Sequence, residues 1–509
     1  MNIRKLLTRL VSLALIAVFL PTVAMADTWY LEDGSITVSA TDSGQNVSQG
    51  GVTKEDSAPV IRNRDSSAST TNNVTIRADT GATASVTLKD TNIDTTGGAG
   101  PKGAGDAAVR TEGGGNVNLN VELDNTLQSG NTHAGVEKGN GGNLTIGSES
   151  GSGQLVAVGA DGGAGIGSED RLASGNYNVG NITITGGDIF ATGNGGGAGI
   201  GGGWYCSASD ITITGGNVTA VGKEDNPNRI GGAGIGGGGS QSSNAGGGSN
   251  LKITGGRVTA VGGNFSAGIG GSIGSNGDNI TISDAEVIAI GGTCAAGIGG
   301  GCRLGNGIVG QGTNISISGS ANVKAAGGVG DSMDGAGAAI GAGGSHQGTT
   351  AQEGAADTSG LSPDGSVERL DPGTTFDIPQ PKPRSSFPKP APDPVAVEEE
   401  PQPVKAALYR VIDETGKALP VETKQEDGVL LLTAQADIAI LEGAISGLQT
   451  LQSRGIDTIT FTNGTISVSF SLAEVIAKGA SSDVYRLTLS GGEANFTLAD
   501  ADITALLGK

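Results

Sequence analysis

A segment that recurs at a nearly regular spacing constrains the fold of this chain more than any other feature. The two fullest copies read NITITGGDIFA from Asn181 and DITITGGNVTA from Asp210. The copies begin at Asn143, Asn181, Asp210, Asn250, Asn279 and Asn314. An Ala-Gly-Ile-Gly element or a near relative accompanies the copies and starts at Ala164, Ala198, Ala233, Ala267, Ala296 and Ala338. Such self-similarity is the sequence signature of a solenoid, in which each repeat stacks on its neighbours.

The pattern inside one repeat predicts three short strands. Ile182 and Ile184 alternate with threonines, which is the period of two of a half-buried strand. Gly186–Gly187 then turns the chain, because glycine accepts the positive φ of a tight corner, and asparagine suits the corner before the strand. A second strand, such as Val218–Val221, and the Ala-Gly-Ile-Gly element complete the repeat. The pattern therefore predicts a mainly β chain whose repeats are the coils of a right-handed parallel β-helix.

The repeats set the limits of the predicted β-helix domain at residues 27–345. Six clear repeats span residues 143–345. Looser copies near Asn73, Ser85 and Asn116 predict irregular coils up to about residue 142.

The N-terminus has the features of a secretory signal peptide. Three basic residues precede an apolar stretch, Leu10–Leu20, which is too short for a permanent membrane anchor. Small residues then predict cleavage between Ala26 and Asp27. We expect residues 1–26 to be removed, and the mature chain to be secreted or held non-covalently at the cell surface, with no membrane span.

Two further parts are expected after the repeats. Residues 346–404 lack strand alternation and hold most of the prolines, which predicts a disordered Gly/Pro-rich linker. Residues 405–509 are predicted to form a small α+β domain.

Local patterns predict the elements of this last domain. An apolar stripe over Ile440–Leu451 predicts a helix, and Thr458–Phe470 predicts a hairpin around an Asn-Gly turn. Ser471 and Glu474 predict a capping box at the start of a second helix. Strands over Val484–Leu498 are expected to pair around two glycines.

The charge of the chain excludes nucleic acid as a partner. The formal net charge is −21, and removal of the signal segment takes away three positive charges, which leaves about −24. Nucleic-acid phosphates attract basic proteins, so this chain is expected to avoid them. Its 94 glycines in 509 residues also occur in disordered chains, so the β-helix is inferred from the pattern alone.

Motifs in the repeat resemble catalytic sites but recur at the repeat spacing. Gly232–Gly237 satisfies GxGxxG without a helix after it, and Gly270–Gly274 satisfies GxSxG in a chain with only two histidines, His133 and His346. We therefore expect no catalytic residue and no cofactor-binding residue there.

Polysaccharide-active β-helix enzymes cluster acidic groups on the outside of neighbouring coils. Here Asp188, Asn217, Arg257 and Glu286 occupy the position after the glycine corner in successive repeats, and they include no carboxylate pair. This pattern predicts a protein that is not an enzyme.

The sequence offers few metal ligands and few cysteines. Gly327–Asp331 comes close to a calcium-binding nonapeptide once, with its aspartate one position early, so calcium stays open but is not indicated, and no metal or other cofactor is predicted. Cys206, Cys294 and Cys302 are an odd number for an oxidising compartment and form no zinc ligand set. A Cys294–Cys302 disulfide across the Ala-Gly-Ile-Gly element is the expected pair, and other pairings stay open.

Two surfaces of the solenoid suggest binding. Segments after Ala-Gly-Ile-Gly, such as Gly236–Ser249, vary in length, and variable insertions on one side of a solenoid often bind ligands, although they can also be tolerated loops. Outward threonines, such as Thr183 and Thr212, resemble those of ice-binding solenoids. Lys252 interrupts the array, and threonine is common in strands in any case.

Over roughly Asn73–Ser345 the repeat resembles extracellular glycine-rich repeat proteins of Gram-positive bacteria, whose coils are similar to pectin-lyase-like right-handed β-helices. The resemblance implies a surface adhesin or carbohydrate-binding protein and supplies no site residues; the C-terminal domain resembles no family. We expect a non-catalytic binding or adhesion protein whose partner is an extracellular glycan or a host or cell-wall surface. A β-helix lyase or glycoside hydrolase is the alternative, and a structural spacer is the third hypothesis.

Overall fold

The structure is a computed structural model of the chain, which divides into two compact units, residues 1–391 and 392–509. We describe each unit by itself. The described residues are 26–384 and 409–508, apart from 97–105, 131, 171–176, 224–229, 242–245, 304–307, 332, 346–349, 352, 415–416, 418, 420, 427, 435, 454–455, 481–482, 491 and 500. Residues 1–25 of the predicted signal peptide lie outside the described residues, and so does His346.

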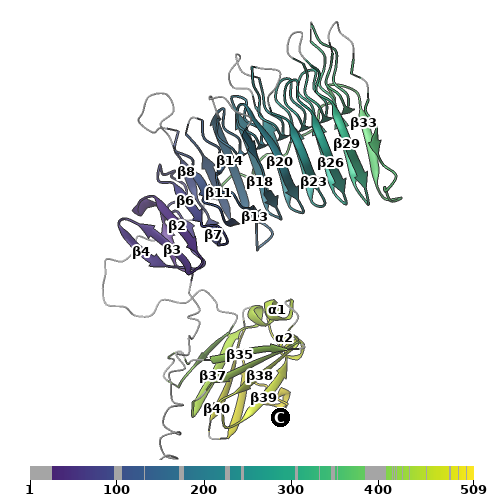
Figure 1. Cartoon of the computed structure of the whole chain (residues 1–509). Coiled ribbons are helices and arrows are strands. Elements are labelled where there is room, and N and C mark those ends of the chain that lie inside the picture. The colour runs from purple at the N-terminus through teal and green to yellow at the C-terminus, as the bar shows by residue number, and fades with distance from the viewer. Residues whose placement is uncertain are drawn as a thin grey trace, which may run out of the picture. The chain divides into compact units, whose positions relative to one another are not determined.

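The first unit is a right-handed parallel β-helix built from three long sheets, as the repeats predict (Figure 1). Each full coil gives one strand to each sheet, and strands of neighbouring coils pair in parallel. Sheet 1 holds β1 (Thr28–Tyr30), β5 (Val60–Arg62), β7 (Thr83–Lys89), β10 (Asn116–Glu122), β13 (Leu144–Gly147), β16 (Tyr177–Val179), β17 (Ile182–Ile184), β20 (Cys206–Ile213), β23 (Gly248–Ile253), β26 (Gly277–Ser283), β29 (Gly312–Ser318) and β32 (Ala356–Asp357). Sheet 2 holds β8 (Asn92–Asp94), β11 (Asp124–Gln128), β14 (Gln154–Asp161), β18 (Asp188–Asn194), β21 (Asn217–Gly222), β24 (Arg257–Val261), β27 (Glu286–Ile290), β30 (Asn322–Ala326) and β33 (Ser366–Leu370).

Sheet 3 contains the Ala-Gly-Ile-Gly elements, each of which forms a strand of only two residues. Its strands are β2 (Ile36–Thr41), β3 (Gly44–Gln49), β4 (Val52–Glu55), β6 (Val74–Ala78), β9 (Val109–Glu112), β12 (Val136–Lys138), β15 (Ile166–Gly167), β19 (Ile200–Gly201), β22 (Ile235–Gly236), β25 (Ile269–Gly270), β28 (Ile298–Gly299) and β31 (Ile340–Gly341). At the N-terminal end β3 and β4 run antiparallel and close the sheet beside β2.

Like residues stack on like residues inside the solenoid. Ile182 of β17 stands in register with Leu144 of β13 and Ile211 of β20, and all three side chains are buried. The threonines between the isoleucines face outward and are partly exposed. Coil-on-coil stacking therefore joins the small apolar residues of each repeat into one continuous core, and the predicted alternation is confirmed.

Two corner positions depend on residue types that tolerate positive φ. Gly236, the second glycine of its Ala-Gly-Ile-Gly, has φ +136°, and a Cβ there would lie 2.0 Å from the carbonyl oxygen of Gly270 in the next coil. The residue that opens a repeat is also left-handed, with φ 57° at Asn181 and 52° at Asn250. Asparagine tolerates this conformation better than most residues, so the predicted asparagine corner is confirmed.

The structure corrects the predicted limits of the β-helix. The segment near Asn73 forms β6 in sheet 3, so it matches the Ala-Gly-Ile-Gly strand and is not the sheet 1 copy that was expected. The segments near Ser85 and Asn116 do lie in sheet 1. At the other end β32 pairs with β29 and β33 pairs with β30, so the predicted end of the domain at residue 345 is wrong.

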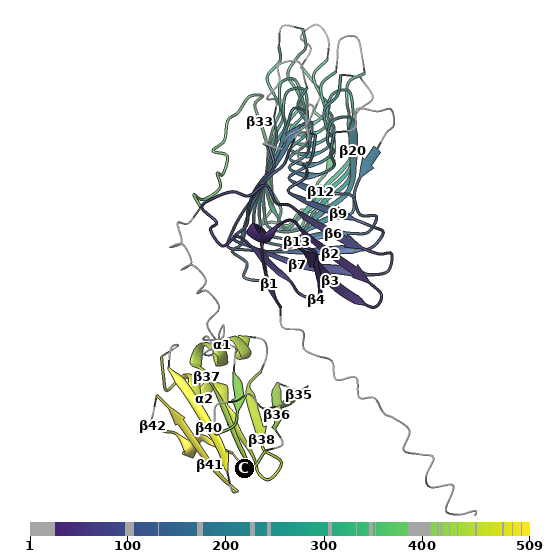
Figure 2. The ribbon, with the colours of Figure 1, turned by 90° about the vertical axis from the view of Figure 1, so that its left-hand side faces the viewer.

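The described part of the predicted disordered linker is also ordered against the solenoid. Beyond β33, residues 371–384 run back along the coils towards the N-terminal end, as the green ribbon outside the sheets shows (Figure 2). The backbone N–H of Lys382 donates to Oε1 of Gln154 at 2.8 Å, and Arg384 reaches Ser66 and Asp124. A long-range contact of this kind leaves no periodic signal in the sequence.

The second unit is a two-sheet structure with two short helices. One sheet has the order β34 (Arg410–Ile412), β37 (Ile438–Ala444), β40 (Val484–Ser490), β41 (Glu493–Leu498) and β42 (Ala501–Asp502). The other has the order β35 (Val421–Glu426), β36 (Val429–Ala434), β38 (Thr458–Thr462) and β39 (Ser467–Ser471). The rings of Phe470, Tyr485 and Phe496 pack together in the buried core.

Predictions for this unit are partly confirmed. The hairpin of β38 with β39 and the pairing of β40 with β41 form as expected. The predicted helix over Ile440–Leu451 is wrong in its first half, because β37 runs to Ala444 and α1 covers only Ile445–Ser453. Ser471 precedes α2 (Leu472–Ile476) without a capping hydrogen bond from its side chain, so the capping box does not form.

Candidate functional site

The outer face of sheet 1 is a regular array of polar side chains. Parallel register places one outward residue of each coil directly beside its counterpart in the next coil. The column that includes Thr183 holds Ser85, Asn118, Thr145, Thr183, Thr212, Lys252, Thr281, Ser316 and Asp357. Hydroxyls therefore dominate this column, and Lys252 is its exposed cation.

A ladder of amide and carboxylate side chains borders this column within strands β20, β23, β26 and β29. Nδ2 of Asn250 donates to Oδ1 of Asp210 at 3.1 Å, and Nδ2 of Asn279 donates to Oδ1 of Asn250 at 2.6 Å. Nδ2 of Asn314 donates to Oδ1 of Asp278 at 2.9 Å in the next coil. The backbone at these positions is fixed by stacking, so the ladder holds its polar groups in one orientation.

The column and the ladder meet in a shallow hollow of about 250 Å³ across β20, β23 and β26. Three successive coils contribute its side chains. The lining residues are Asp210, Thr212, Asn250, Leu251, Lys252, Asn279 and Thr281. One carboxylate, one ammonium group, two amides and two hydroxyls converge there, which suits a ligand rich in hydroxyl groups.

The predicted column after the glycine corner is confirmed in sheet 2. Asp188, Asn217, Arg257 and Glu286 stand in register on successive coils. Arg257 pairs with Glu286 at 2.7 Å, and Asn217 donates to Asp188 at 2.8 Å. Burial acts to raise the pKa of Asp188, but the hydrogen bonds from Asn217 and Lys382 outweigh it and hold that pKa below its ordinary value. From Asp124 to Ser366, no two carboxylates of this column are register neighbours.

A charged cluster on sheet 3 is the main feature that the sequence did not reveal. Nδ1 of His133 lies 2.6 Å from Glu137 and 3.6 Å from Glu169, and Nε of Arg110 donates to Glu137 at 2.8 Å. The hydrogen bond to Glu137 raises the pKa of His133, against burial and the nearby guanidinium of Arg110. The four residues come from separate coils and loops, so only the register of β9 with β12 and β15 shows that they meet.

The donor atoms of His133, Glu137 and Glu169 lie within 4.8 Å of one another, which is a spacing that could hold a metal ion. Arg110 already places a fixed cation against this set, 3.2 Å from His133 and 2.8 Å from Glu137. Two carboxylates face a guanidinium and an imidazole whose pKa is raised, so these residues fit a salt-bridge network better than a cation site.

The structure brings together the two cysteines that were expected to pair. Cys294 and Cys302 are buried thiols whose sulfurs lie within 4.8 Å of each other and of a carboxylate oxygen of Asp334. Arg303 holds Asp334 at 2.6 Å, and both of these side chains are buried. The hydrogen bond with Cys294 and burial raise the pKa of Cys302. Cys206 lies apart, with its thiol against the carbonyl oxygens of Glu169 and Trp204, so the predicted pairing remains a prediction that the geometry permits.

The described parts of the segments after Ala-Gly-Ile-Gly form hydrogen bonds from coil to coil. The N–H of Gly238 donates to the carbonyl oxygen of Cys206 in the previous coil at 2.9 Å, and that of Gly343 donates to Gly310 at 3.0 Å. Coil-to-coil hydrogen bonds therefore continue through the described part of these segments, and the expectation that the segments bind a ligand stays a prediction.

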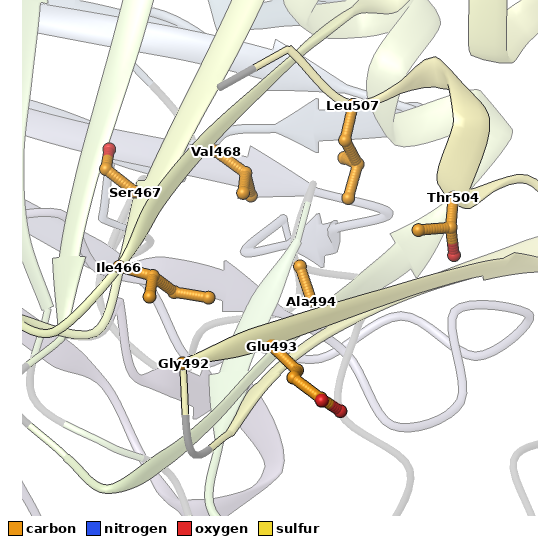
Figure 3. A pocket seen from close by; sticks show the side chains of 8 residues that line it. All are labelled: Ile466, Ser467, Val468, Gly492, Glu493, Ala494, Thr504 and Leu507. Atoms are coloured by element: carbon orange, nitrogen blue, oxygen red, sulfur yellow. The ribbon is translucent and has the colours of Figure 1, made fainter.

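The second unit has its own hollow of about 590 Å³ between β39 of one sheet and β41 of the other (Figure 3). Ile466, Val468, Ala494 and Leu507 give it an apolar lining, and Glu493 points away at its rim (Figure 3). Gly508 pairs with Ser469 at the edge of β39. The sequence suggested no ligand for this unit.

Among the described residues, no helix has the length and apolar character needed to cross a membrane. A family described as Beta helix repeat matches residues 182–204, 211–239, 251–274 and 280–302. Comparisons with curated proteins and with solved structures give no match. The four matched segments are four successive coils, of which the last three contain the hollow of sheet 1, so the similarity and the parallel sheets together support a pectin-lyase-like β-helix.

Proposed function

We propose that this is a non-catalytic, secreted or surface-displayed protein that binds an extracellular glycan on the outer face of sheet 1. The observation that carries the proposal is the hollow formed by Asp210, Lys252 and their neighbours on three successive coils. Amides, hydroxyls and single charges are the groups that hydrogen-bond sugar hydroxyls. The same kinds of group recur at each coil, about 4.8 Å apart, which suits a polymer better than a single small molecule.

Preorganisation supports binding at this face. The hydrogen bonds from Asn250 to Asp210 and from Asn279 to Asn250 fix these side chains before any ligand arrives. Binding therefore costs little side-chain entropy, which is one of the costs that association has to overcome.

The charge of the chain narrows the ligand class. A mature chain with a net charge near −24 repels acidic polymers at long range. We therefore expect an uncharged glycan rather than an acidic one.

A charge-removing substitution in the hollow tests the proposal. Lys252→Gln removes the ammonium group of the hollow, and Lys324→Gln removes an exposed ammonium group from sheet 2, where it pairs with Glu368. On a glycan array followed by titration, Lys252→Gln should weaken binding about tenfold, the value of one charge-assisted hydrogen bond, and Lys324→Gln should leave it unchanged. Equal effects of the two substitutions would contradict binding at this face. Absence of binding to any glycan would favour a structural spacer.

A polysaccharide-active enzyme is the second candidate, and one observation favours it. The cluster of His133, Glu137 and Glu169 supplies acid and base groups close together beside sheet 3. Assays for new reducing ends and for unsaturated products on the same glycan panel separate the two functions. Turnover that His133→Gln abolishes would establish the enzyme and overturn the proposal of a non-catalytic protein.

A further inference from the structure

Residues 371–384, the strap, occupy a surface of the solenoid that is complementary to them. The strap begins at the coil of β30, where the N–H of Gly373 donates to the carbonyl oxygen of Gly327 at 2.9 Å. It ends at the coils of β11 and β8, where the guanidinium of Arg384 is inserted. Six strand spacings separate β30 from β11, or about 29 Å.

Only a nearly extended chain covers this distance. The segment from Gly373 to Arg384 spans about 34 Å in a polyproline II conformation. Thr374, Phe376 and Ile378 are half-buried, whereas the residues between them are exposed, which is the alternation of an extended segment lying on a surface. Prolines at 379, 381 and 383 share the register of the exposed residues and keep the backbone extended.

The strongest contacts form a pocket for the Arg384 side chain. The guanidinium donates to the carbonyl oxygens of Ser66 at 2.9 Å and of Asp124 at 2.8 Å, and also to that of Thr91. Oδ1 of Asp90 accepts at 3.3 Å, and the Asp90 side chain is only 4% exposed. Three carbonyl oxygens and one buried carboxylate from different coils thus surround one cation.

Lys382 makes a second, weaker contact. Its ammonium group pairs with Asp188 at 2.7 Å and is 72% exposed, whereas its backbone exchanges hydrogen bonds with the Gln154 side chain. The Arg384 side chain is only 19% exposed, so solvent screens its contacts less than those of Lys382. We therefore expect Arg384 to contribute more than Lys382 to the binding of the strap.

We propose that this surface is a docking surface for an extended, proline-alternating peptide with two cations two residues apart, and that the strap is its releasable occupant, acting as a latch. The latch decides where the chain leaves the solenoid. When it is closed, the connection to Tyr409 starts after Arg384, beside the N-terminal coils. When it is open, the connection starts after Leu370 at the opposite end of sheet 2, so the strap itself is added to its length.

Trypsin offers a direct test on the full chain. Prolines follow Lys382 and Lys389, so Arg384–Ser385 is the one ordinary trypsin site between residues 371 and 404. Cleavage needs the arginine side chain that the closed latch buries, so its rate reports the fraction of open latch when opening is fast. A synthetic peptide of residues 378–391, digested in the same buffer, gives the rate for a fully open site.

Asp90→Asn is the test variant, because it removes only the charge, and asparagine tolerates the φ of 59° at this position. Glu286→Gln is the matched control, since it removes a carboxylate from the sheet 2 column that pairs with Arg257. We expect the wild-type chain to be cut at least tenfold more slowly than the peptide at low salt. Asp90→Asn should raise that rate about tenfold and Glu286→Gln should not change it.

Salt gives a second measurement that does not depend on a variant. Raising NaCl from 0.05 to 1 M shortens the screening length to about 3 Å and should raise the wild-type rate several-fold relative to the peptide. Cleavage of the wild-type chain as fast as the peptide would overturn docking. If trypsin does not cut the wild-type chain or either variant at any salt concentration below the unfolding temperature, the proposal that the strap is releasable is wrong.

Discussion

Backbone conformation explains why so many residues of the repeat are glycine or asparagine. Asn250 and Gly236 both have positive φ, but they differ in the space around them. Asn250 needs a side chain for the ladder that follows the coils, whereas Gly236 has no room for one. The glycines that resemble nucleotide-binding and hydrolase motifs are therefore corners of the solenoid.

Substitution of single glycines by alanine tests this explanation. In Gly236→Ala the added Cβ would lie 2.0 Å from a backbone oxygen at a φ of +136°, whereas in Gly186→Ala the nearest atom lies at 3.8 Å and φ is not positive. We expect Gly236→Ala to lower the free energy of unfolding by more than about 3 kcal/mol and Gly186→Ala to change it by less than about 1 kcal/mol. Chemical denaturation monitored by circular dichroism measures both, and similar losses would contradict the steric argument.

The cysteines carry a second prediction at this scale. In an oxidising compartment Cys294 and Cys302 should form a disulfide, because their sulfurs already lie within 4.8 Å of each other. Alkylation of the denatured native protein should label Cys206 alone, and peptide mapping should find the 294–302 pair. Three labelled cysteines, or a disulfide that includes Cys206, would contradict the pairing.

His133 predicts a pH dependence of stability. Its pKa is raised above 6.5 by Glu137, so the folded state binds the proton more tightly than the unfolded chain does. The pair of His133 with Glu137 therefore adds to the free energy of unfolding. This stabilisation is complete below about pH 6.5 and is lost as the pH rises through the raised pKa of the folded state. A pair of this partial exposure stabilises by at most about 1 kcal/mol, or roughly 2 °C in Tm.

Thermal melts from pH 5 to 9 check this contribution. The difference in Tm between the wild-type protein and His133→Gln should be largest at low pH and should vanish at high pH. A Tm difference that grows as the pH rises would contradict stabilisation by protonated His133.

At the scale of elements, the sequence predicted the strands that recur in every repeat and missed the elements that do not recur. Ile182, Ile184 and their counterparts predicted sheet 1, because alternation and spacing repeat in every coil. The β33 segment SVERL is followed by no Ala-Gly-Ile-Gly element, so it was assigned to the linker, although it pairs with β30 along its whole length. Ile440 and Leu441 fit a helical stripe and a buried strand equally well, and tertiary pairing with β40 decided for the strand.

The candidate sites follow the same rule. The sheet 2 column from Asp188 to Glu286 could be read from the repeat, because register preserves position. The cluster of Arg110, His133 and Glu169 could not, since its members occupy different positions in irregular coils. The strap contacts join residues that are far apart in the chain, such as Lys382 and Asp188, and no local pattern encodes them.

The coil that contains β32 and β33 predicts that a chain ending before it is less stable. Ending the protein after Ser345 would remove β32 and β33 and leave β29 and β30 with unpaired edges, whereas ending it after Ala391 keeps both pairings. We expect the shorter chain to melt at a lower temperature and to associate at equal concentration. Melting curves and light scattering of the two truncated chains test this, and identical behaviour would place the end of the solenoid at residue 345 after all.

At the scale of the whole molecule, the solenoid unit combines a polar face, a net negative charge and a reversible strap. Its core comes from small aliphatic residues stacked coil on coil, so the outer faces are free to differ without loss of the fold. Sheet 1 uses this freedom for hydroxyls and amides, which is why we assign glycan binding to it.

Hydrogen–deuterium exchange with and without a bound uncharged glycan tests this assignment most directly. We predict that added protection will concentrate in β20, β23 and β26, whose residues line the hollow of sheet 1. Protection confined to the cluster around His133 or to the second unit, with sheet 1 unchanged, would contradict it.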